Sequence, residues 1–110
     1  MVPLVYDGMM KRGMSKRDFA ALVSCNAARR YRLKDKGYIG KGFDADLFFM
    51  DPKGSWTVDN RDLLYKMKWS IYEGMKLEGR IISTMVRGNL VYSEGNILQE
   101  AGYGRFIKPR

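Results

Sequence analysis

The stretch KGYIGKGFDADLFFMD, Lys36–Asp51, decides the fold that we expect for this chain. Its three glycines suit tight turns, because glycine adopts positive φ angles at little steric cost. The four apolar residues Leu47–Met50 follow without alternation, which predicts a strand that is buried on both faces. Asp51 and Pro52 should end this strand, since proline cannot donate a hydrogen bond to the ladder.

Two short carboxylates, Asp44 and Asp46, lie at the entrance of this strand. Aspartate side chains accept hydrogen bonds from nearby backbone N–H groups and stabilise turns. We therefore expect both carboxylates to fix the chain direction just before the strand begins.

The residues before this stretch predict three helices. The first covers Val2–Lys11. The second begins after Ser15, which has the spacing of an N-cap, with Asp18 placed as in a capping box. Asn26 is predicted to cap a third, short helix over Ala27–Leu33.

The residues that follow predict a mixture of short elements. Trp56–Val58 is β-prone, and Asp59 can cap a helix that continues through Met67. Ser70–Gly74 is interpreted as a loop whose aromatic side chains pack on a neighbouring surface. A Ser and a Tyr lie together there, but no base that could activate a hydroxyl is suggested nearby.

The C-terminal third predicts a β-hairpin. Arg80–Arg87 is β-like, Gly88-Asn89 is a two-residue turn signal, and Leu90–Tyr92 forms the return strand. Glu94–Asn96 then turns again, and Ile97-Leu98 adds a few strand residues. The expected fold class is α+β.

Length and composition limit the possibilities. The chain has 110 residues, of which 45% are hydrophobic, so it has room for one small domain. No apolar run approaches the roughly 20 residues that cross a bilayer, and the N-terminus does not have the pattern of a signal peptide. Cys25 is the single cysteine and cannot form an internal disulfide. We therefore expect a reduced, cytoplasmic setting and no membrane partner.

The net charge of +8 is concentrated at the N-terminus, where residues 1–36 carry nine Lys or Arg and three Asp. Such a region either binds an anionic partner or forms helix faces that are solvated or that meet acidic protein outside this chain. We favour the second interpretation. Arginines surround Tyr31 in the segment Arg29–Lys34, an arrangement that can grip phosphates and stack a base. Helical spacing instead favours Tyr31 as a core residue. No nucleic-acid-binding motif surrounds it, so no specific nucleic-acid partner is expected.

Histidine is absent from the sequence. This excludes Ser-His and Cys-His nucleophile pairs and imidazole metal ligands, and one cysteine excludes a thiolate cluster. Enzymatic chemistry of these kinds cannot be assembled from this chain alone.

Several spaced motifs together resemble cyclic amidohydrolases, the family of allantoinases, hydantoinases and dihydroorotases. The central stretch matches the pattern KG-x-I-x-x-G-x-DADL-x-x-x-D of the segment that follows the barrel in these enzymes. Further matching patterns are N-x-A near residue 26, S-x-Y-x-G-x-x-L-x-G at 70–79, T-x-V-R-G-x-x-V-Y-x-x-G at 84–95 and G-x-G-R-F at 102–106. Alanine and arginine stand at 27 and 32 where the family has proline and glycine, and isoleucine stands at 71 in place of proline.

The resemblance implies a fold and a function. In that family a (β/α)8 barrel carries one or two divalent metals, such as zinc, held by histidines, an aspartate and usually a carboxylated lysine. Residues 1–33 resemble the last barrel helices, and residues 34–110 resemble the C-terminal share of a small composite β-sandwich. The family's metal ligands and catalytic aspartate lie upstream of the matched segment. Asp44, Asp46 and Asp51 match a structural motif, so no catalytic, cofactor-binding or metal-binding residue is expected here.

Three functional hypotheses follow. The first is a C-terminal fragment of a cyclic amidohydrolase that is inactive alone and either self-associates or pairs with the missing barrel. The second is a stand-alone binding or regulatory module derived from that domain, one that could pair with a separate barrel chain. The third is a small basic nucleic-acid-binding protein, whose affinity would fall steeply with salt.

Overall fold

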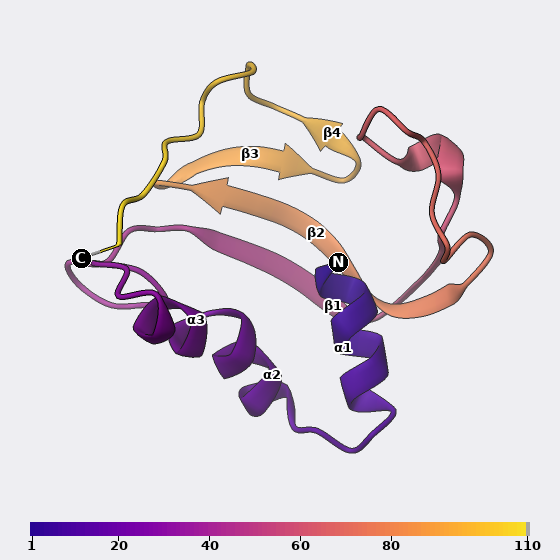
Figure 1. Ribbon diagram of the computed structural model, residues 1–110, viewed down its shortest axis with the longest axis horizontal. Helices are drawn as coiled ribbons and strands as arrows, with labels where there is room; N and C mark the ends of the chain where they lie inside the picture. Colours follow the sequence, from indigo (N-terminus) through magenta and orange to yellow (C-terminus); the bar gives the residue numbers. More distant parts are fainter. Residues whose placement is uncertain (110) are drawn as a thin grey trace.

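Three helices and a four-stranded antiparallel sheet make up the α+β fold of the computed structural model, which describes residues 1–109 (Figure 1). The strands follow the chain in the order β1-β2-β3-β4, so β1 and β4 form the two edges. The elements are α1 Val2–Met10, α2 Lys16–Val23, α3 Cys25–Arg30, β1 Leu47–Thr57, the 3₁₀ turn Asn60–Asp62, β2 Lys76–Val86, β3 Asn89–Ser93 and β4 Asn96–Ile97.

The helices are short, and none within the described part of the chain is long and apolar enough to cross a membrane. The predicted N-cap of α2 is confirmed, because the Ser15 hydroxyl accepts a hydrogen bond of 3.1 Å from the Asp18 N–H. The predicted start and end of α3 are wrong. This helix begins at Cys25, before Asn26, and it ends at Arg30 because the chain turns at Arg32, whose φ of 51° lies outside the right-handed helical region.

The helix α1 packs on β2 and forms the centre of the small core. Tyr6 is 3% exposed, and its ring contacts that of Phe19 edge to face at 5.1 Å between centroids. Asp7, the next residue on α1, is polar but buried. Its carboxylate accepts hydrogen bonds from the Glu78 N–H at 3.0 Å and from the Lys11 ammonium at 2.7 Å. These bonds tie the first helix to a strand that lies 71 residues further along the chain.

The strand β1 is longer than the sequence predicts, because Asp51 and Pro52 do not end it. Its pairing with β2 shifts register between Asp51 and Ser55. Proline is tolerated at an edge strand and in a bulge, where its missing N–H breaks no ladder bond. The β-prone residues Trp56-Thr57 therefore belong to the same strand.

The prediction that Leu47–Met50 is buried on both faces is wrong for this chain. Phe48 is 38% exposed and Phe49 is 50% exposed. Successive residues of a strand point to opposite faces, so each face of β1 leaves one aromatic ring in contact with solvent.

The predicted helix from Asp59 through Met67 is also wrong, since only one 3₁₀ turn forms there. Asp59 does act as a cap, and its carboxylate accepts a hydrogen bond of 2.8 Å from the Arg61 N–H. The helix does not propagate because Leu63 adopts an extended conformation with φ −72° and ψ 131°.

The predicted hairpin is confirmed, but its turn lies one residue earlier than expected. Arg87 and Gly88 occupy the turn with φ values of 48° and 80°, and β3 begins at Asn89. Glu94 and Gly95 form a second turn of the same kind before β4. Two successive positive φ values match the twist of antiparallel strands, which explains both tight connections.

The close approach of α1 to β2 gives a first testable prediction. Gly79 has a φ of 90°, and a Cβ atom there would lie 2.4 Å from the Tyr6 ring. Gly95 has a φ of 92°, and a Cβ atom there would have no neighbour within 4 Å. Both alanine substitutions incur the strain of a positive φ, of about 1–2 kcal/mol.

Only Gly79→Ala also forces the tyrosine aside, at a further cost of about 1–3 kcal/mol. Urea unfolding followed by circular dichroism should therefore show a larger loss of stability for Gly79→Ala than for Gly95→Ala. Equal losses would contradict the contact between α1 and β2.

Candidate functional site

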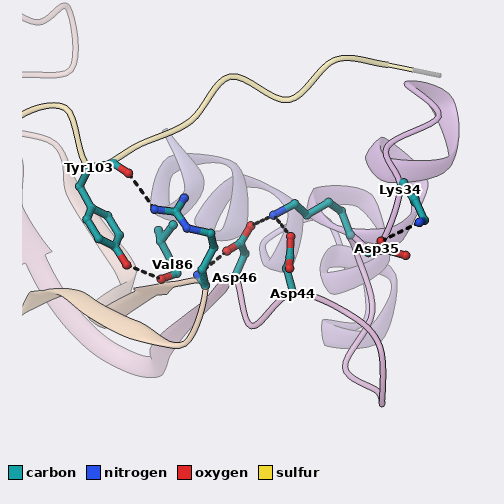
Figure 2. Close-up of polar contacts among 8 residues, drawn as sticks. Lys34, Asp35, Asp44, Asp46, Val86 and Tyr103 are labelled. Atoms are coloured by element: carbon teal, nitrogen blue, oxygen red, sulfur yellow. Dashed lines mark hydrogen bonds and ion pairs between the residues drawn. The ribbon is translucent and has the colours of Figure 1, made fainter.

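Three motifs that lie far apart in the sequence meet at one polar junction (Figure 2). They are the entrance of β1 with Lys36, Asp44 and Asp46, the β2–β3 turn with Arg87, and the C-terminal segment with Tyr103. We call these five residues the junction.

Asp46 connects the entrance of β1 to the β2–β3 turn. One of its carboxylate oxygens accepts a hydrogen bond of 2.7 Å from the Arg87 N–H, and the other contacts the Lys36 ammonium. The same ammonium lies 2.7 Å from the Asp44 carboxylate. The Gly88 N–H donates to the Ala45 carbonyl oxygen at 3.1 Å, which fixes the turn against the strand entrance a second time.

Arg87 extends the junction to the C-terminal segment. Its guanidinium donates a hydrogen bond of 2.8 Å to the Tyr103 carbonyl oxygen, and its Cζ atom lies 4.6 Å from the centre of the Tyr103 ring. The Tyr103 hydroxyl accepts a hydrogen bond of 2.8 Å from the Asn89 side chain. The tail is thus held by a cation–π contact and by hydrogen bonds to the hairpin.

Burial and ion pairing act in opposite directions on the junction residues. Burial raises the pKa of the Asp46 carboxyl, but hydrogen bonds from Lys36 and the Arg87 N–H outweigh it and hold the pKa below its ordinary value of 3.8. Burial lowers the pKa of the Lys36 ammonium, but its bonds with Asp44 and Asp46 leave the pKa above its ordinary value of 10.5. Asp46 and Lys36 are therefore both charged near neutral pH.

The aspartates of the junction do not fit a divalent metal. The Lys36 ammonium contacts both carboxylates and so occupies the position that a cation would take. Across residues 1–109, no three or more His, Cys, Asp or Glu side chains gather as a metal site would require. The structure places Asp51 elsewhere, where its carboxylate accepts a hydrogen bond of 2.9 Å from the Lys53 N–H.

The remaining residues that the sequence singles out have local contacts. The Ser70 hydroxyl accepts a hydrogen bond of 3.1 Å from the Tyr72 N–H, a contact that stabilises a turn. The Arg29 guanidinium donates to the Tyr38 hydroxyl at 3.2 Å. The interpretation of Tyr31 as a core residue is wrong, because α3 ends before it and its side chain is 64% exposed.

A cavity of about 200 Å³ lies between α2, the loop that follows α3 and the start of β1. Its walls are mostly apolar and include Val23, Leu47 and Phe48. The charged residue of its lining is Asp46, whose oxygens are already bound to Lys36 and Arg87. The mostly apolar lining of this cavity is suited to packing against other apolar groups.

Asp7 is a buried structural carboxylate that sequence reasoning missed. A bond from the Lys11 ammonium and a second from the Glu78 N–H lower its pKa, while burial opposes them. The spacing of Asp7 and Lys11 by four residues was visible in the sequence as a helical ion pair. No pattern in the sequence indicates the hydrogen bond from the distant Glu78 N–H.

Comparisons with known proteins show the family to which the chain belongs. A model of the Amidohydrolase family matches residues 4–91. The chain belongs to this family. It is 36% identical over 107 residues to an allantoinase from Rubrobacter xylanophilus and 40% identical over 101 residues to an allantoinase from Salmonella newport. The predicted resemblance is thus confirmed.

Solved structures of this family share the fold. A D-hydantoinase superimposes with a TM-score of 0.88 at 29% identity, and the L-hydantoinase from Arthrobacter aurescens with a TM-score of 0.83 at 29% identity. These matches cover 99% and 96% of this chain but 24% of each hydantoinase. The allantoinase matches cover 97% and 92% of this chain and 23% and 22% of those enzymes. The amidohydrolase chain described here therefore spans about a quarter of the length of its relatives.

The junction generates a second testable prediction. Asp46→Asn should lower the free energy of unfolding by about 1–2 kcal/mol near neutral pH, because two charge-assisted hydrogen bonds are weakened. The control is Asp35→Asn, since Asp35 contacts Lys34 at 3.5 Å on the surface and asparagine tolerates its φ of 57°. The control should change stability by less than about 0.5 kcal/mol.

The pH dependence has a defined sign. A lowered carboxyl pKa stabilises the folded state above pH 3.8, and this contribution is lost as the pH falls through the folded pKa. The raised pKa of Lys36 stabilises the folded state below pH 10.5, and its contribution is lost as the pH rises through the folded value. The difference between wild type and Asp46→Asn should therefore shrink in acid. A difference that grows below pH 3.8 would contradict the ion pair.

Proposed function

We propose that this chain forms the C-terminal part of a cyclic amidohydrolase that opens ureide rings such as allantoin or hydantoin, and that it is inactive without the metal-bearing barrel. Residues 1–33 would complete the last helices of that barrel. Residues 34–110 would provide the C-terminal share of the composite β-sandwich beside it.

The observation that carries the proposal is the partial match to longer enzymes. Nearly the whole chain aligns with an allantoinase, yet it accounts for 23% of that enzyme. The sequence contains no histidine, so it cannot supply the histidine ligands on which the barrel site of the family relies. The chemistry must then reside in the remainder of the enzyme, and this segment has a structural role.

The junction supports this structural role. It occupies the motifs that carry the resemblance, and its carboxylates bind Lys36 and the Arg87 N–H. These bonds lock the strand entrance, the hairpin and the tail into one unit. We propose that this unit lies beside the barrel and supports it without contacting the substrate.

The identity of the relatives favours ureide substrates. The curated relatives named above are allantoinases at 36% and 40% identity, and the solved structures are hydantoinases at 29%. Allantoin contains a hydantoin ring, so a single type of barrel site fits both names. We therefore choose allantoin as the first substrate to test.

A domain-exchange experiment tests the proposal. The C-terminal quarter of the Rubrobacter xylanophilus allantoinase is replaced by this chain, and allantoin hydrolysis is measured with added zinc. We expect activity from the chimera, because the backbone of this chain has the shape of that segment in related enzymes. The chain alone should give no turnover, since residues 1–109 gather no metal site that could activate water.

The control is the allantoinase that lacks its C-terminal quarter. It should be inactive or insoluble, which would show that the exchanged segment is required. Metal-dependent hydrolysis by the isolated 110-residue chain would refute the proposal. Recovery of activity when the chain is mixed with the truncated enzyme, without fusion, would favour a module that pairs with a separate barrel chain.

A further inference from the structure

Among the three helices, α1 is the one that packs on the sheet. Across residues 1–109, no Cα atom of α2 or α3 lies within 8 Å of a strand Cα atom, whereas α1 contacts β2. Figure 1 shows α1 against the sheet and the other two helices beyond the β1 edge. A cavity also separates α2 from the start of β1. The orientation of the helices on the sheet therefore depends on how α1 is held.

Two adjacent residues of α1 meet two adjacent residues of β2. The Asp7 carboxylate accepts the hydrogen bond of 3.0 Å from the Glu78 N–H. The Tyr6 ring covers Gly79, where a Cβ atom would lie 2.4 Å from it. The Trp56 indole N–H donates to the Gly79 carbonyl oxygen at 3.2 Å and so fixes the strand beneath the tyrosine. The bond to Asp7 adds direction to this packing, because a hydrogen bond weakens when its angle changes.

The Glu78 N–H lies in a part of β2 that is paired with one strand. Glu78 is opposite Ser55 of β1, whereas β3 pairs with β2 from Ser83 to Val86. A buried backbone N–H that has no acceptor is costly. The Asp7 carboxylate supplies the acceptor here, in place of a carbonyl oxygen from a further strand.

The second partner of Asp7 cannot orient the helix. The Lys11 ammonium lies 2.7 Å from the carboxylate, but Lys11 belongs to the end of the same helix and its side chain is 65% exposed. This ion pair moves with α1. The bond from Glu78, which joins segments 71 residues apart, is the one that fixes α1 relative to the sheet.

We infer that Asp7 is a positioning residue that sets the orientation of the barrel on the β-sandwich in the complete enzyme. The inference rests on the proposed function, in which residues 1–33 belong to the barrel and residues 34–110 to the sandwich. The bond between Asp7 and Glu78 then crosses the boundary between the two domains. Asp7 takes no part in the chemistry, and its effect on hydrolysis comes from holding α1 in place.

Three substitutions separate the acceptor from the charge. Asp7→Leu removes both, Asp7→Asn keeps an acceptor oxygen, and Lys11→Met removes the ion pair alone. Amide hydrogen exchange of the 110-residue chain, followed by NMR, measures protection at Glu78 relative to the amides between β2 and β3. This ratio should fall at least about tenfold in Asp7→Leu and change by less than about threefold in the other two variants.

The chimera with the barrel of the Rubrobacter xylanophilus allantoinase tests the positioning role. Asp7→Leu should lower kcat for allantoin at least about tenfold with little change in KM, because misoriented molecules are inactive and the others are unaltered. Asp7→Asn should retain most of the activity. The matched control is Gly95→Ala, which strains a turn remote from α1 and should leave kcat within about twofold.

The outcomes distinguish this inference from the proposed function. An active chimera whose kcat is unchanged by Asp7→Leu would overturn the inference and leave the proposed function intact. So would an equal loss of kcat in Gly95→Ala, or an Asp7→Asn variant as impaired as Asp7→Leu. An inactive chimera without substitutions would instead contradict the proposed function. Exchange at Glu78 then decides whether Asp7 orients α1, and equal protection in Asp7→Leu and wild type would overturn that role.

Discussion

The carboxylate of Asp46 links the entrance of β1 to a turn that lies 41 residues further along the chain. One oxygen accepts the Arg87 N–H, and the other contacts the Lys36 ammonium. Because Arg87 in turn binds Tyr103, the position of the C-terminal segment depends on the same carboxylate. The side chains of Lys36 and Asp46 are only 13% and 31% exposed, so this ion pair is less screened by solvent than a surface pair.

Hydrogen bonds to carboxylates recur because the apolar core is small. Within the described residues the buried hydrophobic side chains are Tyr6, Phe19, Ala28, Val58 and Leu77. Asp7 contributes to this core region by accepting a hydrogen bond from the Glu78 N–H. This bond fixes the position of α1 along β2. A few directional bonds between distant segments therefore define the tertiary arrangement that a larger core would otherwise define through packing.

Local signals in the sequence predicted the N-terminal helices and the hairpin, but the helix predicted from Asp59 through Met67 did not form. Long-range contacts decided the limits of several elements. Ser15 and Asp18 predicted the N-cap of α2 because capping depends on residues within one turn. The turn at Arg87-Gly88 was displaced by one residue because its position depends on the bond between Arg87 and Asp46, which no local pattern contains. Pro52 failed to end β1 for a similar reason, since proline is tolerated at an edge strand and the edge position follows from the order of the whole sheet. The residues of the junction were visible as motifs, but their bonds to one another were not.

The exposed aromatic residues are largely separate from the polar contacts that hold the backbone. Carboxylates and positive-φ turns fix the backbone from within. The backbone superimposes on a segment of a D-hydantoinase with a TM-score of 0.88 at 29% identity. Large side chains such as Phe49 and Trp69 contribute little to that internal structure and face solvent. Burial of such rings against another surface is favourable at about 25 cal/mol for each Å² removed from water. The interactions that define this fold are thus separate from the apolar surface that is available for association, and a change in one need not disturb the other.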